Sequence, residues 1–137
     1  MLYEEDFVCL VGSGRRVGPR RLTLKQYLEL PHALVETLDG QQTLVDRPLA
    51  QLGLKRRVGL SIPFFVPAIF AIASTDLVLT VLRRLVQKTA SMVGVHVAEP
   101  PREIKGFPYF MVWHPRLTAE PAHAWFREHL RTAARAI

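Results

Sequence analysis

Short apolar runs alternate along the chain with longer stretches of helical period, and glycine, proline or polar pairs separate them. We expect strands at Phe7–Gly12, His32–Thr37, Val58–Ile62, Leu77–Val81, Val95–Ala98 and Phe107–Trp113. We expect helices at Thr23–Leu30, Thr43–Leu52, Phe64–Ala73, Leu82–Met92 and Glu120–Ala136. This alternation predicts an α/β fold with a mostly parallel sheet.

Local signals support these boundaries. Thr23 can cap the first helix, and Pro31 stops it. Asp39-Gly40 is a turn dipeptide that closes the second strand. The strands in the middle of the chain are apolar at successive residues, as expected when helices cover both faces of a sheet.

The segment Gly59–Leu82 has the length of a membrane span and carries one charge, Asp76. Pro63 and Pro67 near its start and the polar break Ser74-Thr75-Asp76 near its end argue against a span. Its β-branched residues gather at the two ends, so we interpret it as strand, buried helix and strand. We therefore expect no membrane partner.

Length and composition fit one soluble globular domain, or two small lobes that share strands. The 137 residues are 49% hydrophobic and 22% charged, which is ordinary for such proteins. Cys9 is the one cysteine, so an internal disulfide and a multi-cysteine zinc site are excluded. The acidic start, Met1–Asp6, shows no signal peptide, and we expect a cytoplasmic protein.

The net charge of +6 raises the question of a nucleic-acid partner. The basic residues fall in clusters at Arg15-Arg16, Arg20-Arg21, Lys55-Arg56-Arg57 and Arg83-Arg84. No aromatic residue accompanies them, and they lie in different predicted loops and helices. We interpret them as solvated surface that contributes at most to steering a partner or effector.

The sequence offers no enzyme chemistry. It contains no H-E-x-x-H, G-x-S-x-G or Walker motif. Cys9 lies inside an apolar run, where an inert thiol is usual, and His114 and His123 are too isolated to be metal ligands. We expect no catalytic residues, no metal and no cofactor. Trp113, Trp125 and Phe126 are expected to pack the last strand against the last helix.

A set of ordered motifs resembles the LysR family of bacterial transcription regulators. The stretch Arg57–Phe65 reads R-V-G-L-S-I-P-F-F, and an apolar helix and Thr75-Asp76-Leu77-Val78 follow it. This is similar to the branch with an R-V-x-L-x-x-P-x-F strand and a T-D-L strand. Further pieces agree in order: Phe7–Val11, Leu22–His32, Val45–Leu54, Trp113–Arg116 and Pro121–Trp125. Each piece is weak alone, but together they cover nearly the whole chain.

The resemblance implies a periplasmic-binding-protein type II-like domain of two α/β lobes. Residues 1–21 would be a remnant of the first lobe with a crossover, and residues 22–99 a complete second lobe. Residues 100–137 would be the return crossover, strand and C-terminal helix of the first lobe. The crossings are expected near Gly14–Arg21 and Pro100–Gly106, which assigns the strand Phe7–Gly12 to the incomplete lobe. The family's winged helix-turn-helix and the first elements of that lobe are expected to be absent.

By resemblance, a small effector binds in the cleft between the lobes, and Pro63, Phe64 and Phe65 line it. A strand end that opens a helix offers free N–H groups to a ligand, which favours this assignment. Thr37 and Leu38, ending the preceding strand, are the next candidates, and Thr75 is weaker. The alternative is that the two phenylalanines are core residues.

The function that follows is effector sensing and oligomerisation in a LysR-type regulator. We expect an aromatic or carboxylate-bearing effector, a homo-oligomer, and DNA contact only through a winged-helix domain outside this sequence. The alternative is a stand-alone small-molecule-binding or decoy protein without DNA-binding function.

Overall fold

The computed structural model describes residues 1–12, 14, 21–36, 43–87 and 94–136. Its internal contacts divide the chain into two units. Unit 1 consists of Met1–Asp6 and Gly106–Ile137, and unit 2 of Phe7–Lys105. The chain therefore passes from one unit to the other after Asp6 and again after Lys105.

Unit 2 is built on a five-stranded sheet with the order β4-β3-β5-β2-β6. Its strands are β2 (Phe7–Gly12), β3 (Pro31–Val35), β4 (Arg57–Ile62), β5 (Val78–Leu82) and β6 (Val95–Ala98). Strand β3 is parallel to β4 and β5, whereas β2 is antiparallel to both β5 and β6. Four strands thus run in one direction and β2 runs against them, which confirms the expected α/β fold and mostly parallel sheet.

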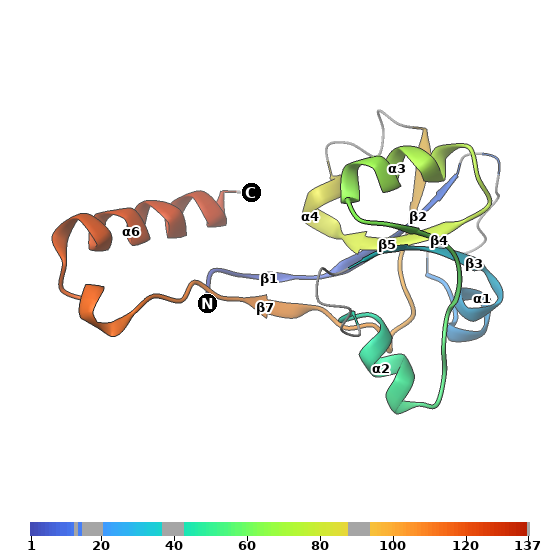
Figure 1. The fold of residues 1–137 in the computed structure, drawn as a ribbon, viewed down its shortest axis with the longest axis horizontal. Helices are drawn as coiled ribbons and strands as arrows, with labels where there is room; N and C mark the ends of the chain where they lie inside the picture. Colours follow the sequence, from blue (N-terminus) through green and yellow to red (C-terminus); the bar gives the residue numbers. More distant parts are fainter. Residues whose placement is uncertain (13, 15–20, 37–42, 88–93, 137) are drawn as a thin grey trace. The chain divides into compact units, whose positions relative to one another are not determined.

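Helices lie between successive strands along the chain and cover both faces of the sheet (Figure 1). They are α1 (Leu24–Glu29), α2 (Asp46–Gln51), α3 (Phe65–Ala73) and α4 (Arg83–Val86). The first begins with the expected cap, because Gln26 N donates to Thr23 Oγ1 at 3.2 Å and Thr23 N donates to Gln26 Oε1 at 2.9 Å. Leu30 is already extended, and β3 starts at Pro31, where the helix cannot continue.

The apolar core of unit 2 lies between α3 and one face of the sheet. Alternate residues of the two central strands reach it, and the whole buried cluster is Val8, Leu10, Ala33, Ala68, Ile69, Ile72, Leu79, Val81, Val86 and Val95. The residues between them, including Cys9 and Thr80, belong to the opposite face, where Tyr27 of α1 packs. Both faces of β2 are therefore buried, which explains its continuous apolar run.

Gly12 ends β2 at a place with no room for a side chain. A Cβ there would lie 2.6 Å from the Thr75 carbonyl oxygen and 2.8 Å from that of Ile72. These carbonyls belong to the C-terminal turn of α3 and the turn that follows. Glycine is thus required where β2 meets the end of the helix.

Unit 1 contains a two-stranded ribbon and a long helix. Strand β1 (Tyr3–Glu5) pairs antiparallel with β7 (Phe107–Tyr109), and the Tyr3 and Tyr109 rings stack with centroids 5.2 Å apart. A 3-10 turn, η1 (Pro115–Leu117), precedes α6 (Pro121–Arg135). Glu120 caps α6, since its carboxylate accepts from Ala122 N and His123 N.

A buried arginine holds unit 1 together. Arg127 of α6 is 6% exposed and donates to the carbonyls of Leu117 and Thr118 at 3.0 and 2.7 Å. The same guanidinium contacts His123 Nδ1 at 2.6 Å and lies 4.8 Å from the centroid of Trp113. It therefore satisfies carbonyls at the end of η1 and fixes the segment that carries Trp113 against α6.

Some expectations were wrong. The strand Phe7–Gly12 is the antiparallel strand of the unit 2 sheet and no part of unit 1, because it pairs with β5 and β6 along its length. The first crossing is accordingly at Asp6, upstream of Gly14–Arg21, whereas the second falls within Pro100–Gly106.

Other elements differ in length or contacts. Strand β7 ends at Tyr109, short of Trp113. Trp125 and Phe126 are 63% and 56% exposed, so they do not pack against that strand. The expected helix Leu82–Met92 begins at Arg83, and its residues 88–92 lie outside the described part of the chain.

Candidate functional site

The carboxyl ends of β3 and β4 meet at one edge of the sheet because the two strands are parallel. Glu36 N donates to the Ile62 carbonyl at 3.1 Å, which continues the pairing to the end of both strands. Ser61 Oγ donates to Glu36 Oε1 at 2.5 Å. This edge therefore presents a carboxylate and a hydroxyl beside the segment that begins α3.

Pro63, Phe64 and Phe65 follow β4 directly, and all three are exposed. Phe64 is the N-cap of α3 in an extended conformation, and its side chain is 67% exposed, while that of Phe65 is 41% exposed. Neither phenylalanine is a core residue, so that alternative is wrong for both. No side chain of the N-cap residue satisfies the first N–H groups of the helix. The arrangement combines accessible aromatic rings with the N–H groups of Phe65 and Val66 at the helix start, since Pro67 in the same turn has no N–H.

The other candidate residues are placed differently. Thr75 lies beyond the far end of α3, roughly 14 Å along a helix of this length, and it precedes β5 instead of following a strand. Its hydroxyl donates to the Ile72 carbonyl at 3.3 Å and accepts from Leu77 N at 3.4 Å, so it shapes the turn into β5. The structure does not bring Thr75 together with Pro63–Phe65. Thr37 and Leu38 lie outside the described residues.

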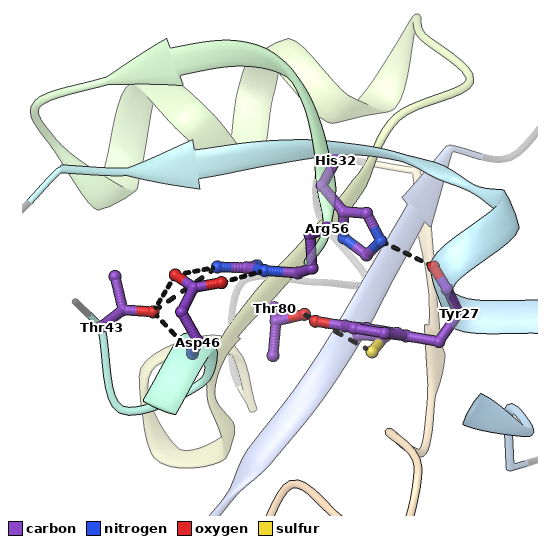
Figure 2. A network of polar contacts seen from close by, with 7 residues as sticks. Tyr27, His32, Thr43, Asp46, Arg56 and Thr80 are labelled. Atoms are coloured by element: carbon purple, nitrogen blue, oxygen red, sulfur yellow. Dashed lines mark hydrogen bonds and ion pairs between the residues drawn. The ribbon is translucent and has the colours of Figure 1, made fainter. Parts of the chain in front are cut away.

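A buried network of polar side chains lies on the sheet face opposite α3 (Figure 2). Arg56, just before β4, is 4% exposed and donates from Nε and Nη2 to the two carboxylate oxygens of Asp46, each at 2.8 Å. Thr43 Oγ1 donates to Asp46 Oδ2 and accepts from Asp46 N. The bidentate pair thus ties the start of α2 to the start of β4.

The second half of the network joins α1, β2, β3 and β5. Tyr27 and Thr80 share a hydrogen bond of 2.7 Å between their hydroxyls, and Cys9 Sγ lies 3.7 Å from Thr80 Oγ1. His32 Nε2 contacts the Tyr27 carbonyl at 2.7 Å. A carbonyl only accepts, so Nε2 carries the hydrogen, and Nδ1 has no hydrogen-bond partner among the described residues.

Burial dominates the protonation behaviour of these groups. It lowers the pKa of His32 to about 4, raises the pKa of the Cys9 thiol to about 12 and raises that of Tyr27 above its ordinary value. Burial alone would also raise the pKa of Asp46, but hydrogen bonds from Arg56 and Thr43 hold it below its usual value. The network consequently holds one ion pair and otherwise neutral groups.

This network has a structural role and contains no reactive group. The Cys9 thiol stays protonated, which makes it a poor nucleophile. Within the described ranges, no three His, Cys, Asp or Glu side chains gather as metal ligands. The network instead fixes the elements that carry the β3–β4 edge.

Sequence reasoning missed Arg56 because it was grouped with Lys55 and Arg57 as solvated surface. One of the three is buried, and its partner Asp46 stands at the start of a helix ten residues earlier. The signal available in the sequence was the combination of an acidic residue at the start of a helix, Asp46, with a basic residue just before the following strand, Arg56.

Two further cationic residues from the basic clusters also form ion pairs. Arg21 and Arg83 both pair with Glu99, at 3.8 and 2.7 Å.

Comparison with known proteins defines the class. The model of the LysR substrate binding domain family matches residues 1–135, so the chain belongs to this family. Its fold is the two-lobe type of periplasmic binding proteins, as in the solved regulatory domains described next. No helix among the described residues is long and apolar enough to cross a membrane.

Individual relatives are transcription regulators. The chain is 31% identical to the HTH-type transcriptional regulator SyrM 1 of Sinorhizobium fredii, over 98% of this chain and 40% of that protein. It is 28% identical to the activator NagR of a Ralstonia species, over 93% of this chain and 42% of the relative. The chain therefore spans about two fifths of the length of these curated relatives.

Solved structures of transcription regulators are also similar to this chain. The regulatory domain of MexT, an activator in Pseudomonas aeruginosa, is 30% identical with a TM-score of 0.75, and the match covers 96% of this chain and 64% of that one. A transcriptional regulator from Vibrio parahaemolyticus has a TM-score of 0.80 at 24% identity, over 98% and 63% of the two chains.

Proposed function

We propose that this chain is the effector-sensing part of a LysR-type transcription regulator, acting in the cytoplasm without enzymatic activity. A small molecule binds at the β3–β4 edge against Pro63, Phe64 and Phe65. Thr37 and Leu38, which lie outside the described residues, are proposed as further effector contacts, and Thr75 is the weakest candidate because it lies at the far end of α3. The bound regulator contacts DNA through a winged-helix domain and works as a homo-oligomer.

The observation that carries the proposal is the exposure of Phe64 and Phe65 at the start of α3. Two aromatic rings left in solvent at a strand end provide apolar contact area for a flat ligand. The uncapped N–H groups of the helix provide donors for a carboxylate. Together these features favour an aromatic acid as effector. No observation favours the stand-alone alternative.

The test is a thermal-shift screen of the chain against aromatic acids, followed by titration of any hit. A ligand that binds the folded chain raises its melting temperature by mass action. Phe64→Ala or Phe65→Ala should weaken binding at least tenfold for one of the two. Because both side chains are exposed, neither change should lower the melting temperature of the free chain appreciably.

Phe70→Ala is the matched control. Phe70 is 61% exposed on the same helix, more than one turn beyond Phe65. Its substitution therefore removes a similar exposed aromatic side chain, but away from the proposed site. Equal affinity losses in all three variants, or unchanged affinity in Phe64→Ala and Phe65→Ala, would place the site elsewhere.

A further inference from the structure

The side chains of His123 and Arg127 contact each other one turn apart on α6. Arg127 Nη1 lies 2.6 Å from His123 Nδ1 and also donates to the Leu117 carbonyl at 3.0 Å, while Nη2 donates to the Thr118 carbonyl at 2.7 Å. A guanidinium only donates, so His123 Nδ1 accepts and Nε2 carries the hydrogen. We name these two side chains and two carbonyls the Arg127 clamp.

The Arg127 clamp in this form requires a neutral His123. A protonated imidazole carries a hydrogen on both ring nitrogens, so Nδ1 can no longer accept from Arg127. Two positive charges would then face each other at hydrogen-bond distance. Arg127 is 6% exposed, which limits the screening of this repulsion by water. A proton on His123 therefore removes one hydrogen bond of the clamp and repels its central charge.

The surroundings of His123 contribute in both directions. His123 is in the first turn of α6, where the partial positive charge of the helix end disfavours a cation. The Glu120 carboxylate favours one, but it is exposed and already accepts from the N–H groups of Ala122 and His123. The other charged or titratable side chains on the two elements that the clamp joins are Glu128, His129, Arg131 and Arg135 of α6 and His114 and Arg116 at η1. Among these, Glu128 pairs with Arg131 at 3.3 Å, so it gives no separate support to a charged His123.

His129 on the same helix has the opposite hydrogen-bonding role. Its Nδ1 lies 2.8 Å from the Trp125 carbonyl, which only accepts, so Nδ1 donates. A second proton on His129 goes to Nε2 and leaves this bond in place. The two histidines of α6 therefore differ in whether a proton breaks their contact.

The clamp holds the segment before α6 against the helix. The centroid of the Trp113 ring lies 4.8 Å from the Arg127 guanidinium, and Trp113 Nε1 donates to Thr118 Oγ1 at 3.2 Å. Trp113 is 36% exposed, so apolar burial alone does not fix it. The placement of Trp113 and η1 thus depends on the cation that His123 contacts.

We propose that the Arg127 clamp is an acid-sensitive switch in unit 1. Protonation of His123 releases η1 and Trp113 from α6, and loss of the proton restores the contact. Histidine is the side chain suited to such a switch, because it ordinarily changes charge between about pH 5 and 8. The switch lies within unit 1 and does not depend on the effector site of unit 2.

The experiment compares the full chain at about pH 7.5 and about pH 5.5, on either side of the usual histidine range. Hydrogen exchange is corrected for the intrinsic pH dependence of the amide reaction. The amides of η1 and of the first turn of α6 should then exchange about tenfold faster at the lower pH, because a hydrogen bond to a charged donor is lost. In a Trp125→Phe chain Trp113 is the remaining tryptophan, and its emission should shift to longer wavelength in parallel.

Three variants separate the role of His123 from a general effect of acid. His123→Gln offers an acceptor that does not titrate, so the clamp should stay protected at both pH values. His123→Lys places a permanent positive charge there, so exchange should be fast at both. His129→Gln is the matched control on the same helix and should keep the pH response of the original chain. Amides of unit 2 report separately on the effect of His32.

Two results overturn the proposal. Unchanged exchange of η1 and α6 in the original chain would mean that the protonated imidazole turns away while Arg127 keeps its carbonyls. A pH response that persists in His123→Gln, or that disappears equally in His129→Gln, would assign the acid sensitivity to another group.

Discussion

Among the described residues, each unit buries one arginine, and the two arginines are buried in opposite ways. In unit 2, Arg56 makes a bidentate pair with Asp46 next to an extensive apolar core. In unit 1, Arg127 makes no ion pair with a carboxylate among the described contacts; it binds carbonyls, a histidine and the face of Trp113. Around Arg127 the large aromatic side chains of α6 are left in solvent.

The difference shows what each arginine contributes. A charge pair with one fully buried partner is costly to separate, because the partly buried carboxylate that remains loses its charged hydrogen-bond donor. An arginine that donates to backbone carbonyls compensates for sparse apolar packing. Its hydrogen bonds order a turn and a helix that few apolar contacts hold together. We therefore expect Arg56 to govern the stability of a whole unit and Arg127 to govern local order.

The largest expected effect is that of Arg56→Ala. It leaves the Asp46 carboxylate without its buried partner and removes the side chain that ties the start of β4 to the start of α2. Unit 2 should therefore lose about 3–5 kcal/mol of unfolding free energy. Urea unfolding followed by circular dichroism measures this loss. Arg57→Ala, at the exposed neighbouring position, should change stability by less than about 0.5 kcal/mol. Similar losses in the two variants would show that the pair with Asp46 is not what stabilises the unit.

A smaller effect concerns pH. The pKa of His32 is about 4 in the folded chain and near 6.5 when unfolded. Between these values the unfolded state binds a proton that the folded state does not, so stability should fall as pH drops from 6.5 to 4 and then level off for this group. The loss is about 3 kcal/mol at most.

His32→Gln removes the titrating group and should flatten the stability profile between pH 6.5 and 4. Asp46 acts in a lower window, since its depressed pKa gives stability that is lost only below its usual range. A profile that is the same in the variant and in the original chain would exclude His32 as the source of the acid sensitivity.

The smallest effect is expected in unit 1. Arg127→Met should release η1 and Trp113 from α6, with a local loss of about 2 kcal/mol from hydrogen bonds that involve a charged donor. Hydrogen exchange of α6 should increase, while the unfolding midpoint of unit 2 stays the same, because the contacts of Arg127 lie within unit 1. Arg131→Met is the control, since Arg131 lies farther from Trp113, at 5.9 Å. If unit 2 melted earlier in Arg127→Met, the two units would share one cooperative transition.

Much of unit 2 was predictable from sequence, because its helices and strands have a strong hydrophobic period or clear start and stop residues at their ends. Strands Phe7–Gly12 and Val95–Ala98 have the expected bounds, and the Thr23 cap and the Pro31 stop act as expected. The pairing of β2 was not predictable in this way. An apolar run shows that a strand is buried on both faces, but it does not say which neighbours bury it or in which direction they run.

Unit 1 and the candidate site were harder to predict. Strand β1 is three residues long and rich in glutamate, so its pattern gives no signal without its partner β7. Exposed aromatic residues such as Phe64, Trp125 and Phe126 look like core residues in a sequence, because hydrophobicity does not report which helix face has a neighbour. The placement of Pro63–Phe65 at a strand end followed from the strand–helix pattern, and its binding role stays a prediction.

The single residue between β1 and β2 has a mechanical consequence. Asp6 alone separates strand β1 of unit 1 from β2, an interior strand of the unit 2 sheet, so tension on β1 is passed directly to β2. Tension along β2 would shear its hydrogen bonds to β5 and β6 together, because these bonds lie across the strand on both sides. Asp6 is thus a one-residue covalent link from unit 1 to a strand that is hydrogen-bonded on both sides.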